Sequence, residues 1–89
     1  MLKIETSLDW QHVHTEIQKL GNNLSMFKHD IKLLSKTVQD EVTELSKLEV
    51  EHRSRRSKTT HKQCQAQVAK INETLKLFQK FHLMALLSQ

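Results

Sequence analysis

The chain has 89 residues, with one glycine, no proline, no tyrosine and a formal net charge of +4. Sheets and tight turns depend on glycine and proline to set their backbone angles, so this composition excludes most β-rich folds and favours an all-α protein. No stretch approaches the roughly 20 apolar residues that span a bilayer. Because the start of the chain also lacks the apolar region of a signal peptide, we expect an intracellular protein, cytoplasmic or nuclear.

Residues 1–6 form a lead-in to the first predicted helix. Thr6 and Asp9 have the spacing of a capping box, in which the Thr6 hydroxyl accepts from an early helical N–H and the Asp9 carboxylate reaches back to the cap. This spacing predicts a helix that begins near Ser7.

Apolar side chains recur three and then four residues apart over residues 10–48, as in a heptad repeat. The seam that they form, a predicted helix–helix interface, consists of Trp10, Val13, Ile17, Leu20, Leu24, Phe27, Ile31, Leu34, Val38, Leu45 and Leu48. A stripe with this period stays on one side of a helix only when the helix supercoils around another, so the pattern predicts a coiled coil. Glu41 interrupts the seam, and we expect Val42 to replace it as the inward residue. The alternative is a register-setting charge at Glu41 that faces a Lys or Arg of a partner.

Gly21 and the two asparagines after it are the local helix breakers in the first half of the chain. The seam nevertheless keeps its register across them. This favours one helix over residues 7–51 with a weak point at Gly21, and a helix that ends at Leu20 is the alternative.

A second apolar stripe follows a basic, polar interruption at residues 52–61. It begins at Cys64 on a second predicted amphipathic helix, residues 62–88, and its interface positions are Val68, Ile71, Leu75, Phe78 and Phe81. On one continuous helix this stripe would lie roughly 160° around the circumference from the seam. A turn within residues 52–61 would bring the two stripes together, so we expect a helical hairpin with a long and a short arm. Because no Gly, Pro, Asn or Asp marks the corner, one long continuous coiled-coil helix is the alternative.

The seam is wider than that of a two-stranded coiled coil. Trp10 and Phe27 are large for such a seam, and Met26, Leu33 and Val42 extend the apolar surface beside it. We therefore expect hairpins to assemble into a multi-helix bundle, with copies of this chain or with other helical proteins as partners.

The end of the second predicted helix, residues 78–87, is apolar around most of its circumference. We expect the bundle core to cover it. A docking surface for another protein and insertion into a membrane surface are the alternatives.

Positive charge gathers in the second half of the chain. A possible phosphate-binding or nuclear-import patch consists of Arg53, Arg55, Arg56, Lys58 and Lys62. No aromatic residue lies between these cations to stack on nucleobases, so we expect a solvated loop here, with nucleic-acid binding as the alternative.

The sequence gives little support for metal binding or catalysis. His61 and Cys64 share a helical face, but zinc needs three or four ligands, so we expect no metal and no cofactor. Without a Gly-rich phosphate loop or a nucleophile beside a base, we also expect no enzyme. The sequence predicts a non-enzymatic oligomerisation or scaffold module, or a small subunit of a helical complex. The alternatives are a nucleic-acid-associated helical protein and a membrane-tethering subunit.

Overall fold

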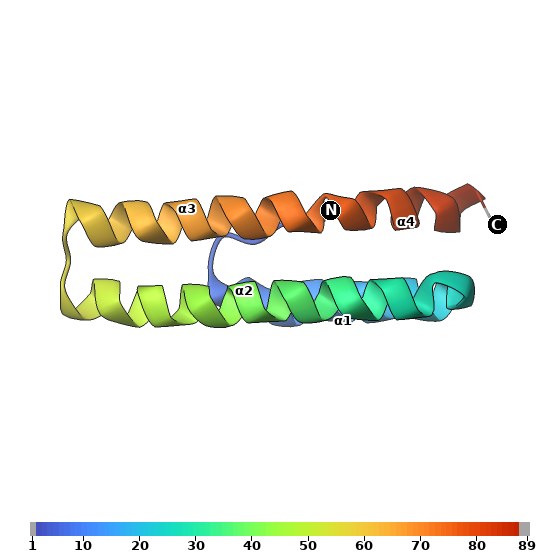
Figure 1. Ribbon diagram of the computed structural model, residues 1–89, viewed down its shortest axis with the longest axis horizontal. Coiled ribbons are helices and arrows are strands. Elements are labelled where there is room, and N and C mark those ends of the chain that lie inside the picture. Colours follow the sequence, from blue (N-terminus) through green and yellow to red (C-terminus); the bar gives the residue numbers. More distant parts are fainter. Residues whose placement is uncertain (1, 88–89) are drawn as a thin grey trace.

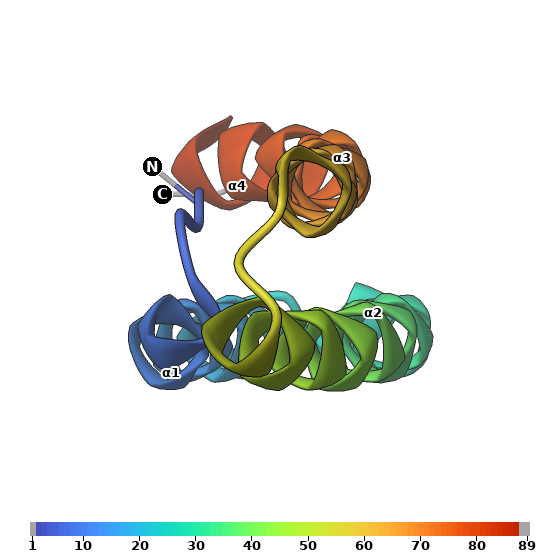
Figure 2. The same cartoon turned by 90° about the vertical axis from the view of Figure 1, so that its left-hand side faces the viewer.

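The computed structural model describes residues 2–87 and shows an all-α fold of three helical segments, of 17, 30 and 30 residues, packed against one another. With η for a 3₁₀ turn, the segments are η1 and α1 (Ser7–Asp9, Trp10–Asn23), η2 and α2 (Ser25–Phe27, Lys28–Ser54), and α3 and α4 (Lys58–Leu75, Leu77–Leu87). Successive segments run antiparallel and form a rod measuring 49 × 17 × 15 Å (Figures 1 and 2). No helix among the described residues is long and apolar enough to cross a membrane.

The first helix ends where the sequence predicted only a weak point. α1 stops at Asn23, Leu24 leaves the helical conformation with φ −117° and ψ 66°, and η2 turns the chain back into α2. The expectation of one helix over residues 7–51 is therefore wrong, and the alternative of an end at Leu20 comes closer. The heptad register led to the wrong prediction of one helix because Leu24 is itself buried inside the turn. The three–four spacing thus continues while the chain reverses.

The second reversal lies at residues 55–57, inside the polar interruption, which excludes the single continuous helix (Figure 1). A capping box marks it: the Ser57 Oγ accepts from the Thr60 backbone N–H, and the Ser57 N–H donates to the Thr60 Oγ1, both at 3.2 Å. The Thr60 hydroxyl also donates to the Arg55 carbonyl at 3.0 Å. Side-chain hydrogen bonds therefore make a corner that contains no glycine or proline.

The third segment begins earlier than expected, at Lys58, and consists of two helices. Lys76 between them keeps helical angles, with φ −60° and ψ −27°, so α4 continues the direction of α3 closely. Residue 1 of the expected lead-in and residue 88 of the expected second helix lie outside the described residues.

One core draws on all three segments. Its buried members are Ile4, Val13, Ile17, Leu20, Leu24, Ile31, Val38, Val42, Leu45, Ile71, Leu75 and Phe78. Partly buried side chains packed against it include Trp10, Phe27, Leu34, Cys64, Val68 and Phe81. Most of the predicted interface residues therefore meet inside a single chain.

Glu41 and Val42 divide the interruption of the seam between them. Val42 is buried and takes the inward position. Glu41 lies half-buried toward α3, where its Oε2 accepts from the Thr74 hydroxyl at 3.2 Å and its carbonyl accepts from Gln67 Nε2 at 2.8 Å.

Residues 2–6, the N-terminal strap, cross from the start of α1 to the third segment (Figures 1 and 2). The Ile4 N–H donates to Asn72 Oδ1 at 2.8 Å, and Asn72 Nδ2 donates to the Ile4 carbonyl at 2.9 Å. The Ile4 side chain is 1% exposed. The strap therefore closes one side of the core, which the prediction of a simple lead-in did not include.

Candidate helix-docking site

α1 covers only part of the hairpin that α2 and α3 form (Figure 1). The Ser7 N–H, just before α1, donates to Glu49 Oε2 at 3.0 Å, and the Ser7 hydroxyl donates to the other oxygen of the same carboxylate. From there the strap turns away toward Asn72. The end of α2 and the beginning of α3 therefore pack against each other without a third helix. We call this part of the hairpin, residues 45–68, the open end.

A groove of about 600 Å³ lies along the open end, between the two helices and the strap. Its floor is apolar: Leu45 is buried, and Cys64 and Val68 are half-buried. Leu8 stands at its edge with 85% of its surface exposed. The polar residues around it are Lys3, Glu5, Thr6, Glu49, His52, Arg53, His61, Gln65 and Asn72.

The end of the groove nearest the hairpin turn is held by hydrogen bonds. His52 Nδ1 lies 2.7 Å from Thr60 Oγ1, and the ring centroids of His52 and His61 are 5.7 Å apart. The Thr60 hydroxyl also lies 3.0 Å from each of the backbone carbonyls of Arg55 and Ser57, so it joins His52 to the turn. These contacts fix the position of α2 against α3 at the turn.

The five predicted cations surround this turn and are all exposed. The ion pairs among the described residues, Glu16 with Lys19 and Glu73 with Lys76, lie elsewhere. No carboxylate in the described part of the chain therefore neutralises the turn cations by direct pairing. Of the five, Arg53 also lines the groove.

Cys64 in the groove floor has a raised pKa. Partial burial raises its pKa, and the carboxylates of Glu49 and Glu51 act in the same direction, so the thiol is protonated at neutral pH. His61 and Cys64 both line the groove, yet residues 2–87 contain no group of three His, Cys, Asp or Glu side chains that could hold a metal ion.

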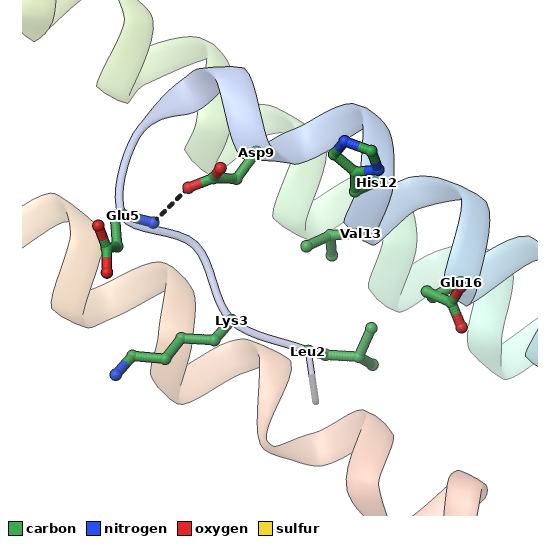
Figure 3. A pocket seen from close by; sticks show the side chains of 7 residues that line it. All are labelled: Leu2, Lys3, Glu5, Asp9, His12, Val13 and Glu16. Carbon is green, nitrogen blue, oxygen red and sulfur yellow. Dashed lines mark hydrogen bonds between the residues drawn. The ribbon is translucent and has the colours of Figure 1, made fainter.

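A second hollow, of about 390 Å³, lies between the strap and α1 (Figure 3). The Asp9 carboxylate beside it accepts from the backbone N–H groups of Glu5 at 2.7 Å and Thr6 at 3.1 Å, and these bonds lower its pKa. The Glu5 and Glu16 side chains point in other directions (Figure 3). Asp9 is therefore a helix cap, as the sequence predicted, and the carboxylates do not converge on a ligand.

The structure separates the predicted interface residues into two groups. Leu48 is half-buried outside the core, and the others belong to the core or pack against it, where Leu45 and Val68 also line the groove. Sequence reasoning missed Leu8 and the strap at the groove edge. The spacing of Ser57 and Thr60, that of a capping box, was the signal that could have located the turn.

Comparisons with protein-family models, curated proteins and solved structures found no match. The groove and the charges around it are therefore the basis for assigning a function.

Proposed function

We propose that this chain is a non-enzymatic interaction module, a scaffold or small subunit of a helical complex, and that a helix of another protein docks at its open end. The observation that carries the proposal is the groove over Leu45, Cys64 and Val68, where the third helix of the bundle is absent. A docked helix would lie in line with α1 and continue the three-helix packing, with coiled-coil contacts between its apolar stripe and the groove floor.

Charge favours a partner that is acidic. The cations around the turn have no carboxylate paired with them, and Arg53 stands at the groove itself. Of the groove carboxylates, Glu5 is matched by Lys3, and Glu49 accepts hydrogen bonds from Ser7. An amphipathic helix with Glu or Asp beside its apolar stripe would neutralise them. Two copies of this chain that met through their open ends would instead bring like charges together. Self-association is thus less suited to this site than a different helical protein.

The test uses two amphipathic peptides about four helical turns long. Both carry the same leucine stripe, one flanked by glutamates and the other by lysines. We expect the acidic peptide to bind the chain in fluorescence anisotropy and the basic peptide not to bind. Arg53→Glu and Val68→Ser should each weaken binding of the acidic peptide by about tenfold, the lower end of what loss of a good interface contact costs.

The matched control is Lys36→Glu, an exposed charge reversal on α2 far from the groove. Circular dichroism verifies that each variant remains folded. Equal binding of both peptides, or equal loss with Lys36→Glu, would contradict docking in the groove.

A nucleic-acid-associated role is the second candidate, and the exposed, unpaired turn cations are the observation in its favour. In this role the turn cations bind phosphates and the groove floor does not contact the ligand, which distinguishes it from helix docking. A duplex oligonucleotide that binds with a steep salt dependence, equally well to the wild type and to Val68→Ser, would favour this role.

A further inference from the structure

The third helical segment presents one exposed row of residues away from the rest of the bundle. At about 100° per residue, the members of this row lie within roughly 60° of the helix circumference. All are exposed, and we call them the outer row: Lys58, Lys62, Gln65, Ala69, Lys76, Lys80, Leu83 and Leu87. Because Lys76 keeps helical angles, the row continues from α3 into α4. It changes from cationic to apolar along its length.

α4 is the least covered apolar part of the fold. Phe78 is its one buried residue, and Phe81 and Ala85 are partly buried against the core. Leu83 is 58% exposed and Leu87 is 80% exposed, so within the single chain the core leaves most of α4 uncovered.

The exposed leucines of α4 are spread too widely for a single partner helix. Leu77, Leu83, Leu86 and Leu87 are all exposed and cover about half of the helix circumference. A docked helix covers a narrower stripe, whereas a lipid interface contacts a broad arc. Met26, in the η2 turn at the same end of the rod, is 86% exposed as well. The rings of Phe27 and Phe81, 5.6 Å apart, hold that turn against α4.

The charges beside these leucines are positive. Lys76 pairs with Glu73 at 2.9 Å, but no Asp or Glu occurs from residue 74 onward, and Lys80 forms no ion pair among the described residues. Lysine stems can extend along an apolar surface and place their ammonium groups at lipid phosphates. Two copies of α4 packed face to face would bring together two surfaces that both carry Lys80 and both lack carboxylates from residue 74 onward. The chemistry of the row therefore fits an anionic lipid surface better than a second copy.

We propose that the outer row is a membrane-surface site, which lies along an anionic bilayer with its lysines at the headgroups and the α4 leucines inserted at the acyl boundary. The face is separate from the groove floor, so the inference does not depend on helix docking. α4 has 11 residues, too few to span a bilayer, so its leucines would enter only the interface.

The test is flotation of the full chain with vesicles of phosphatidylcholine alone and of phosphatidylcholine mixed with phosphatidylglycerol, over a range of salt concentrations. We expect binding to the mixed vesicles that weakens with salt. Lys62→Glu and Lys80→Glu should each weaken it at least about fivefold, the effect of one cation near an anionic surface. Leu83→Gln with Leu87→Gln should weaken it by more than about tenfold, because two leucines leave the acyl boundary.

Leu33→Gln is the matched control, since Leu33 is an exposed leucine on α2 away from the outer row. It should leave vesicle binding unchanged. Absence of binding to the mixed vesicles, or an equal loss with Leu33→Gln, would overturn the proposal. Binding that depends on the lysines but not on the leucines would assign the row to a soluble polyanion and would also overturn it.

Discussion

At the scale of single residues, Glu41 is the side chain that fits the core least well. Its Oε2 accepts from Thr74, but its Oε1 is buried and has no hydrogen-bond partner among the described residues. A carboxylate oxygen withdrawn from water without a partner costs free energy. The seam position was recognisable from its spacing, whereas the contact with Thr74 was not, because it depends on how α3 lies against α2.

We expect Glu41→Leu to raise the free energy of unfolding by about 1–2 kcal/mol, since it removes the unpaired oxygen and completes the apolar seam. Urea denaturation measures the change. Glu44→Leu, at an exposed position of the same helix, should stay within about 0.5 kcal/mol of the wild type. A loss of stability in Glu41→Leu would show that the Thr74 bond outweighs the cost of the buried oxygen.

At the scale of the helices, α1 contains a glycine that its conformation does not require. Gly21 is buried within the helix, and no residue has a positive φ in the described part of the chain. A Cβ at this position would meet Ile31 Cγ2 at 3.6 Å, an ordinary van der Waals distance. The turn after α1 depends instead on Leu24, which leaves helical geometry.

Gly21→Ala should therefore stabilise the protein by about 0.5–1 kcal/mol, the usual gain from replacing glycine inside a helix. Thermal unfolding followed by circular dichroism measures it. Gly21→Leu is the informative comparison, because its longer side chain must displace Ile31 or extend into the hollow that Gly21 and Ile31 line, and it should be less stable than Gly21→Ala. Destabilisation by alanine as well would mean that α1 and α2 approach more closely than the 3.6 Å distance indicates.

The two reversals differ in how far the sequence could locate them. The phase of the stripes favoured a turn between α2 and α3, because apolar faces on opposite sides of one helix cannot share a core. The turn at Leu24 gave no such signal. Its buried leucine preserves the heptad spacing across the reversal. A preserved register therefore indicates that the residues share a core, but it does not show that they belong to one continuous helix.

At the scale of the whole molecule, the strap joins parts of the chain that no periodic pattern connects. Ile4 and Asn72 bond each other across 68 residues of sequence. An asparagine on an amphipathic helix carries no signal in the sequence alone. The spacing of apolar residues therefore could not predict that Asn72 bonds the backbone of Ile4. The same strap forms one boundary of the groove at the open end.

We expect Ile4→Ala to destabilise the protein by about 2–4 kcal/mol through the cavity that it leaves. Asn72→Ala should cost about 1–3 kcal/mol, because two buried backbone groups lose their partner. Chemical denaturation measures both values, and Lys3→Ala, at an exposed strap position, is the control. If Ile4→Ala and Asn72→Ala were both as stable as Lys3→Ala, the strap would not contribute to the stability of the core.

The clamp between Ile4 and Asn72 also sets the order of events during synthesis. Ile4 leaves the ribosome 68 residues before Asn72 does. α1 and α2 can pair earlier, because their contacts are closer in sequence, but the strap has nothing to bind until α3 has emerged. The last step of folding therefore waits until the third segment is made. Until then the apolar faces of α1 and α2 lack the cover that the third segment provides, and exposed apolar surface of this kind promotes aggregation.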